Sequence, residues 1–333
     1  MKSGRSKLDK WDDLRMQVFN NPTQNEIKLA AKALKDGNLV AFPTETVYGL
    51  GADAENVKAV SGIYSVKGRP TDHPLIVHIS STKQSGKWAI DIPDYAIKLA
   101  NEFWPGPMTL IFKRSELAKD FITGGQDTIG LRVPAHQIAQ SLLLEFEKYG
   151  GHGLAAPSAN KFGAVSPTTT DAVVSEIGDE LSAGDFVLNG GHSSIGIEST
   201  IIDCTNKDPI VLRPGAVTGE MINKLLGVKI NVVAPYSSVR VSGMLPTHYS
   251  PKATVKLNEN AKAGDGFIAL ADVPTPIGAV RLAAPIDLND FAQSLYATLR
   301  EADLLGLKTI VVTLPLGDGI ALAIRDRLNK AAG

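Results

Sequence analysis

The chain has few of the residues that build covalent or metal-held frameworks. Its 333 residues include one cysteine, Cys204, and six histidines that do not cluster in the sequence. A single thiol forms no disulfide within the chain and provides no cysteine-based zinc site. The apolar neighbours of Cys204 favour a small core residue. With so few scattered histidines, we also expect no metal site built from protein ligands.

Membrane signals and a strong net charge are lacking too. No stretch approaches the run of about 20 apolar residues that spans a bilayer. The N-terminal segment MKSGRSKLDKWDD is polar and charged, unlike a signal peptide. The formal net charge is −1, so no global field draws the chain onto nucleic acid or a membrane. These features predict a cytoplasmic protein without membrane contact.

The common nucleotide-binding motifs are missing, because the sequence contains neither a Walker-type loop nor a Rossmann glycine fingerprint. If ATP binds, another device must hold it, and the segment Lys67-Gly68-Arg69-Pro70 is a candidate. Lysine supplies a point charge and arginine a bidentate fork, which together suit neighbouring phosphates. Taken alone, such a turn is more often a solvated loop.

The order of apolar runs predicts an α/β fold. We expect strands at 39–42, 75–79, 108–112, 128–133, 153–156, 185–188, 199–203 and 210–213, and helices at about 26–35, 57–64, 96–103, 137–149 and 217–226. Residues 1–20 read as a polar lead-in and 43–51 as a polar turn. Because strands and helices do not alternate regularly, the sheet should be mixed and twisted.

The residue composition changes at about residues 216–253, where turn-forming residues become frequent. The segments Pro235-Tyr236-Ser237-Ser238 and GMLPTHYSP contain the turn residues of a linker. Beyond the linker, strands are predicted at 253–257, 266–271 and 309–314, with helices on either side of the last one. This pattern predicts a second, small α/β unit with a parallel sheet.

Polar side chains stand at several predicted strand ends. Ser158 and Asn160 follow a short apolar strand and offer a hydroxyl and an amide, although a simple helix cap would look the same. Arg132 lies on an otherwise apolar strand. A buried arginine needs an anionic partner, which is either a ligand carboxylate or an internal aspartate or glutamate.

The order and spacing of seven segments are more specific than any one of them. PTETVYGLGADA, KGRPTDHPLIVHI, WPGPMTLIF, TIGLRVPAH, AAPSANKFGAVSPTT, IESTIID and VLRPGAV follow one another between residues 24 and 220. Together they closely resemble the threonylcarbamoyl-AMP synthase family, which is built on the YrdC-like domain. The linker GMLPTHYSP and the tail after it resemble the long, two-domain form of that family.

The resemblance implies a reaction and an architecture. L-threonine, bicarbonate or carbon dioxide, and ATP would give L-threonylcarbamoyladenylate and pyrophosphate. That product would feed the downstream machinery that transfers the threonylcarbamoyl group to tRNA. The implied fold is α/β: a YrdC-like catalytic domain with an open, twisted, mixed sheet at 21–220, a linker and possible active-site lid at 221–252, and a Rossmann-like domain at 253–333.

The resemblance also assigns site residues. Lys67 and Arg69 would be catalytic, stabilising charge at the transferring phosphate. ATP or its adenylate would be contacted by Lys67, Arg69, His73, Thr128, Ser158, Asn160, Ser166 and Arg213. Threonine would be held by Thr46, His78, Arg132, Ala156 and Ser199. Mg²⁺ would be held mainly by the ATP phosphates rather than by protein ligands.

One departure from the family pattern affects the linker. Where the long form often carries basic and aromatic residues, this chain has Leu245 and Pro246. Pro246 has no backbone donor and no polar side chain, so we expect no nucleotide contact there. The alternative function is a double-stranded RNA-binding protein that uses the same basic cavity, and the near-neutral net charge argues against it as the main role.

Overall fold

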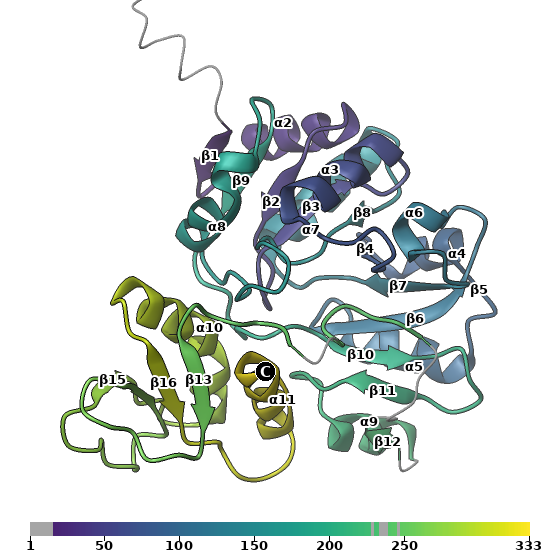
Figure 1. The fold of residues 1–333 in the computed structure, drawn as a ribbon. Coiled ribbons are helices and arrows are strands. Elements are labelled where there is room, and N and C mark those ends of the chain that lie inside the picture. The colour runs from purple at the N-terminus through teal and green to yellow at the C-terminus, as the bar shows by residue number, and fades with distance from the viewer. Residues whose placement is uncertain (1–15, 228–229, 233–238, 245–246) are drawn as a thin grey trace, which may run out of the picture.

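The architecture is that of a computed structural model, which describes residues 16–227, 230–232, 239–244 and 247–333. A large mixed sheet fills the N-terminal part of the chain, and a small parallel sheet lies in the C-terminal part (Figure 1). This arrangement confirms the predicted fold class. None of the described helices is both long and apolar enough to cross a membrane.

The large sheet has the strand order β1-β9-β2-β3-β8-β4-β7-β6-β10-β11-β12, with β5 paired to β6. Its strands are β1 (Gln17–Asn20), β2 (Val40–Phe42), β3 (Gly49–Asp53), β4 (Ile76–His78), β5 (Ala89–Ile90), β6 (Met108–Arg114), β7 (Thr128–Arg132), β8 (Leu154–Ala155), β9 (Phe186–Asn189), β10 (Thr200–Asp203), β11 (Ile210–Arg213) and β12 (Asn231–Val232). Parallel and antiparallel neighbours both occur, as in β4–β7 and β6–β7.

The helices packed on this sheet are α2 (Gln24–Lys35), α3 (Val57–Lys67), α4 (Ser85–Trp88), α5 (Asp94–Phe103), α6 (Asp120–Thr123), α7 (Gln137–Lys148), α8 (Thr170–Ile177) and α9 (Gly219–Leu226). Helix α2 begins with a capping box between Thr23 and Glu26. Helix α3 ends where Gly68 adopts a left-handed conformation, with φ 61°. The turn therefore lies within the Lys-Gly-Arg segment, with Lys67 at the end of the helix and Arg69 beyond it.

Two sequence expectations about this domain were wrong. Residues 43–51 are not all turn, because β3 begins at Gly49 and pairs with both β2 and β8. Its small residues carry no alternating pattern, so backbone pairing in the buried sheet defines the strand. The lead-in at 1–20 contains β1, which pairs with β9 in parallel from Gln17 opposite Phe186. The exposed side chains of that edge strand hide it from a hydrophobicity reading.

The C-terminal sheet has the order β13-β16-β14-β15, and every pair in it is parallel, as predicted. Its elements are β13 (Thr254–Leu257), β14 (Gly266–Ile268), β15 (Val280–Ala283), α10 (Leu288–Leu304), β16 (Thr309–Val312) and α11 (Ile320–Ala332). Helix α10 buries Phe291, Leu295 and Leu299 on one face, which matches the predicted periodicity.

Side-chain alternation along β4 and β7 divides the central sheet into two faces. Val77 and Leu131 point into the main hydrophobic core. Their neighbours His78 and Arg132 point to the other face, and these two residues are direct partners in the parallel register. Two polar side chains thus lie side by side on a face of the sheet that the main core leaves uncovered.

Candidate active site

A small cavity lies over the face of the sheet that holds His78 and Arg132. It is walled by side chains from the central strands, from the turn after β2, from the segment before β10, from the end of β11, and from the linker. The residues that line it are Thr44, Thr46, Val47, Gly49, Arg69, Ile76, His78, Arg132, Ala156, Pro157, Ser158, Glu198, Ser199, Arg213, Ser242, Gly243, His248 and Tyr249.

Arg132 is held in place by a buried ion pair. Its Nη2 donates to Glu45 Oε1 at 2.6 Å, and its Nε donates to the Gly106 carbonyl at 3.3 Å. The second oxygen of Glu45 accepts from the Ala135 backbone at 2.9 Å. Among the described residues, Nη1 of Arg132 has no hydrogen-bond partner. The guanidinium is therefore anchored on one side, while its remaining edge is available to a carboxylate in the cavity.

His78 provides an unsatisfied polar atom in the same wall. The ring is 4% exposed, and its Nδ1 has no hydrogen-bond partner in the part of the chain that the structure describes. Burial, reinforced by the nearby positive charge of Arg132, lowers the pKa of His78 to about 3. The imidazole is thus neutral at physiological pH, and its Nδ1 can form a hydrogen bond with a hydroxyl group.

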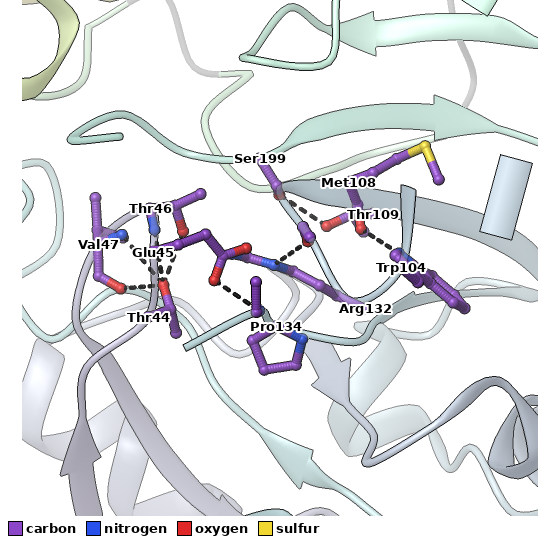
Figure 2. Close-up of polar contacts among 12 residues, drawn as sticks. Thr44, Glu45, Thr46, Val47, Trp104, Met108, Thr109, Arg132, Pro134 and Ser199 are labelled. Atoms are coloured by element: carbon purple, nitrogen blue, oxygen red, sulfur yellow. Dashed lines mark hydrogen bonds and ion pairs between the residues drawn. The ribbon is translucent and has the colours of Figure 1, made fainter. Parts of the chain in front are cut away.

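Hydroxyl groups complete this part of the cavity. Thr46 shares a 2.8 Å hydrogen bond with Thr44, and Ser199 shares one of 2.8 Å with Thr109. The Thr44 hydroxyl also donates to the Val47 carbonyl at 2.6 Å, which holds the turn after β2 in shape (Figure 2). These internal bonds orient the hydroxyls before any ligand is present.

Arg69 and Arg213 bring two further positive charges to the cavity. Arg213 donates from Nε and Nη2 to the Ser199 carbonyl at 3.0 and 2.9 Å, and from Nη1 to the Ser242 carbonyl at 2.9 Å. Arg69 Nη2 donates to the Pro74 carbonyl at 3.1 Å and to Ser242 Oγ at 3.2 Å, and its Nε has no partner within the described ranges.

Neither of these arginines has a carboxylate hydrogen-bond partner among residues 16–227, 230–232, 239–244 and 247–333. Arg69 is 7% exposed and Arg213 is 3% exposed. Burial lowers the pKa of Arg69 to about 10, so the group stays charged at neutral pH. Buried cations without a directly bonded carboxylate are costly, and an anionic ligand relieves that cost.

Lys67 lies behind the cavity rather than in its wall. Its ammonium donates to the Ser158 carbonyl at 2.6 Å and to the Asn160 carbonyl. The Asn160 side chain in turn donates to the Ala164 carbonyl at 2.8 Å. Complete burial, and then the charge of Arg69, hold the pKa of Lys67 well below its usual value. In this conformation Lys67 stabilises the loop at 158–160 through its bonds to two carbonyls of that loop.

The predicted site residues therefore fall into three groups. All five predicted threonine contacts line the cavity, together with Arg69, Ser158 and Arg213 from the predicted ATP contacts. Lys67, Asn160 and Ser166 are buried beside it, and Ser166 donates to Glu198 at 2.6 Å. His73 packs edge to face against Phe162, with ring centroids 5.2 Å apart. Thr128 lines two other surface pockets.

Sequence reasoning did not assign Glu45, Glu198, Ser242 or Tyr249 to the site. The carboxylate of Glu45 was visible in the turn after β2, but its pairing with Arg132 depends on a contact 87 residues away. The linker residues Leu245 and Pro246 lie outside the described residues. Their neighbours Gly243 and His248 do line the cavity.

Four residues of the linker, Ser242, Gly243, His248 and Tyr249, form part of the cavity wall. The open volume that remains is about 50 Å³, whereas pockets that hold a ligand of moderate size have roughly 300–1,000 Å³. The Ser242 contacts with Arg69 and Arg213 close one side of this space. The cavity in this conformation is therefore smaller than a pocket for a nucleotide-sized ligand.

No group of three or more histidine, cysteine, aspartate or glutamate side chains is placed to hold a metal among the described residues. The two carboxylates next to the cavity are already engaged. Glu45 pairs with Arg132, and Glu198 pairs with Arg327 at 2.8 Å. These acidic groups do not fit a protein-held Mg²⁺ site.

An α/β fold with a cavity lined by buried arginines, hydroxyl groups and a histidine is typical of an enzyme that binds anionic substrates. A family profile described as "Telomere recombination" matches residues 32–215, and the profile of the threonylcarbamoyl-AMP synthase C-terminal domain matches residues 217–333. The chain therefore belongs to the threonylcarbamoyl-AMP synthase family, and it is an enzyme of the nucleotidyltransferase type.

Individual relatives agree along nearly the whole chain. The threonylcarbamoyl-AMP synthase of Pyrococcus abyssi is 37% identical, with 92% of this chain and 94% of the relative covered. That of Bacillus subtilis is 34% identical, covering 100% and 99%. The crystal structure of P. abyssi Sua5 complexed with L-threonine superposes with a TM-score of 0.85 at 35% identity, covering 95% of this chain and 97% of that one.

Proposed function

We propose that this chain makes L-threonylcarbamoyladenylate and pyrophosphate from L-threonine, bicarbonate or carbon dioxide, and ATP. One observation carries the proposal: two buried arginines that have no carboxylate partner in the described structure, Arg69 and Arg213, face the same cavity as a third, Arg132, that is already paired. The first two suit phosphates, and the third suits an amino-acid carboxylate.

Recognition of threonine is assigned to one end of the cavity. Its carboxylate would bind the free edge of Arg132, and its hydroxyl would bind His78 or the hydroxyls of Thr46 and Ser199. The Nδ1 of His78, unpartnered among the described residues, supports this assignment, because valine would leave it unsatisfied. The small side chain of Ala156 leaves room for the substrate.

The chemistry needs little covalent participation by the protein. The threonine amine adds to carbon dioxide and loses a proton to give a carbamate. A carbamate oxygen then attacks the α-phosphorus of ATP, and the bond to the bridging oxygen of pyrophosphate breaks. Arg69 and Arg213 would stabilise the charge that develops at the phosphorus, and the cavity would align the reactants.

Lys67 and the remaining predicted ATP contacts support the nucleotide side. Lys67 would hold the Ser158–Asn160 loop in place, and a direct phosphate contact would require its ammonium to leave the two carbonyls. His73, Thr128 and Ser166 remain proposed contacts of ATP or its adenylate, reached once the linker moves. Mg²⁺ would enter with ATP, bound to its phosphates.

The assigned cellular role follows from the product. A carbamoyl-adenylate is a reactive mixed anhydride, so a transferase must consume it, and we assign that role to the tRNA threonylcarbamoyl transfer machinery in the cytoplasm. Double-stranded RNA binding by the cavity is disfavoured, because Arg69, Arg132 and Arg213 are all buried, whereas a duplex-binding groove needs exposed cations.

Product analysis tests the proposal. The protein is incubated with ATP, Mg²⁺, bicarbonate and one of threonine, serine or valine. The products are then separated by chromatography and identified by mass spectrometry. We expect threonylcarbamoyladenylate and an equal amount of pyrophosphate with threonine, and much less product with valine. Pyrophosphate release that does not depend on threonine and bicarbonate would contradict the proposal.

A further inference from the structure

A buried ion pair joins the C-terminal domain to the wall of the cavity. Arg327 in α11 is fully buried, and its Nε donates to Glu198 Oε2 at 2.8 Å. Glu198 comes from the other domain, 129 residues earlier in the chain, and lines the cavity directly before Ser199. In Figure 1, α11 lies on the side of the small domain that faces β10 and β11.

The carboxylate of Glu198 accepts hydrogen bonds from both domains. Tyr296 of α10 donates to Oε2 at 2.8 Å, and Ser166 donates to Oε1 at 2.6 Å. Arg327 Nη2 also reaches the Glu198 carbonyl at 3.4 Å. Burial alone would raise the pKa of Glu198, but the charges of Arg327 and Arg213 outweigh burial and lower it to about 2. The carboxylate is therefore ionised at neutral pH.

The same arginine also contacts the linker. Its guanidinium lies 5.5 Å from the ring centroid of Tyr249, which lines the cavity and is 1% exposed. Tyr249 stacks on Tyr296 with ring centroids 5.6 Å apart and an interplanar angle of 26°. Arg327 thus touches two separate parts of the cavity wall, although it does not line the cavity itself.

The residue after Glu198 connects this pair to the substrate side. The Ser199 carbonyl receives two hydrogen bonds from Arg213, and the Ser199 hydroxyl pairs with Thr109. The dipeptide Glu198-Ser199 is therefore held between two arginines, Arg213 at the cavity and Arg327 behind it. A shift of Glu198 would displace Ser199 and rotate the Ser199 carbonyl to which Arg213 donates.

We propose that Arg327 is a positioning residue for the synthase site, and that the C-terminal domain completes this site by holding Glu198, and with it Ser199 and Tyr249, in working geometry. The proposal rests on the proposed synthase activity. It gives the second domain a role in catalysis through one identifiable contact, rather than through general stabilisation of the chain.

The test compares Arg327→Met with the wild type in threonine titrations of pyrophosphate release and in threonine binding by calorimetry. We expect the KM and the Kd for threonine to rise by about tenfold or more, with a smaller change in kcat, because small displacements at a site weaken binding strongly. The control is Arg325→Met in the same helix. Within the described residues, the Arg325 guanidinium bonds only to Pro315 and Gly317 of its own domain. This control should leave threonine binding unchanged.

A double variant separates positioning from stability. Arg327→Met leaves Glu198 as a buried carboxylate without its ion-pair partner, whereas Arg327→Met with Glu198→Gln removes both charges of that pair. We expect the double variant to regain the melting temperature of the wild type but to keep the raised threonine KM. If restored stability also restores KM, Arg327 is merely structural and the proposal is wrong.

The remaining outcomes are also decisive. If Arg327→Met does not fold, Arg327→Lys is measured, and its shorter, non-planar head group should still raise the KM for threonine. Wild-type binding and kinetics in any of these variants would overturn the positioning role. A wild-type protein that makes no carbamoyl-adenylate would instead overturn the proposed function, so the two failures are distinguishable.

Discussion

At the scale of single residues, the site depends on how each charge is balanced. Arg132 has Glu45 as a counter-ion, whereas Arg69 and Arg213 bond, within the described structure, only to carbonyl and hydroxyl groups. A paired arginine can orient a substrate carboxylate without a large excess of positive charge. Unpaired buried arginines attract the more highly charged phosphates. Under the proposed function, this distribution of counter-ions would place the two substrates at different ends of one cavity.

Lys67→Ala and Arg69→Ala should each abolish pyrophosphate release that depends on threonine and bicarbonate. Arg69 brings a buried positive charge to the cavity, and Lys67 holds the loop that carries Ser158. The measurement is steady-state pyrophosphate release, with circular dichroism to show that both variants fold. Full activity in either folded variant would refute its assignment.

His78→Leu should reduce the preference for threonine over valine. The variant would lack the hydrogen bond between the neutral imidazole and the substrate hydroxyl. The leucine side chain would pack equally well against the side chain of threonine or of valine. We expect the ratio of kcat/KM for threonine to that for valine to fall by about tenfold, as for the loss of one buried hydrogen bond. An unchanged ratio would show that the hydroxyl is recognised elsewhere.

At the scale of elements, the linker is held by the two arginines that we propose as phosphate contacts. Ser242 receives hydrogen bonds from both Arg69 and Arg213, so under the proposed function substrate phosphates and the linker would compete for the same guanidinium groups. Gly243 allows this close approach because it has a φ of +81°, and a Cβ there would meet the Tyr249 hydroxyl at 2.3 Å. The closed linker therefore depends on glycine at this position.

Gly243→Ala should loosen the linker and speed tryptic cleavage after Arg240, which is already exposed. A matched control is Gly264→Ala, since Gly264 also has a positive φ, +88°, but a Cβ added there would meet no atom of the described structure within 4 Å. Both variants carry backbone strain, and only the first clashes with Tyr249. We expect faster cleavage after Arg240 in Gly243→Ala than in the control or the wild type. Mass spectrometry measures the rate at which the cleaved peptides appear. Equal cleavage rates in all three proteins would contradict this view of the linker.

At the scale of the whole molecule, burial of neutral histidines links stability to pH. Burial lowers the pKa of both His78 and His248 to about 3 in the folded protein, from a usual value of 6.5. The unfolded chain therefore binds protons on these rings at a pH where the folded chain does not. Protons favour the unfolded state, and stability should fall as the pH decreases from about 6.5 towards 3.

His78→Gln should make the protein less sensitive to acid. Removing one such group reduces the slope of unfolding free energy against pH by up to about 1.4 kcal/mol per pH unit within that window. The measurement is the melting temperature of the wild type and the variant between pH 7.5 and about 4, where loss of the proton linkage predicts curves that converge or cross. Curves that stay parallel throughout would show that His78 does not contribute.

Local patterns in the sequence were enough to predict many of the elements. Apolar runs located strands such as β4, β7 and β16, and helical periodicity located the buried face of α10, because these signals depend on neighbours within a few residues. The same approach missed β1 and β3, whose pairing is defined by the backbone of a distant strand. Ordered motifs, rather than any single residue, indicated the family and the set of site residues.

The partners of the charged groups were beyond local reasoning. A buried arginine at position 132 predicted an anion, but the choice between a ligand and an internal carboxylate depended on Glu45, 87 residues earlier in the chain. The pairing of Arg327 with Glu198 spans 129 residues and two domains. The sequence by itself determined which chemical groups are available and where the apolar runs that bury them lie. Folding determined which charges neutralise one another and which remain for the substrates, because that balance depends on distances between segments far apart in the chain.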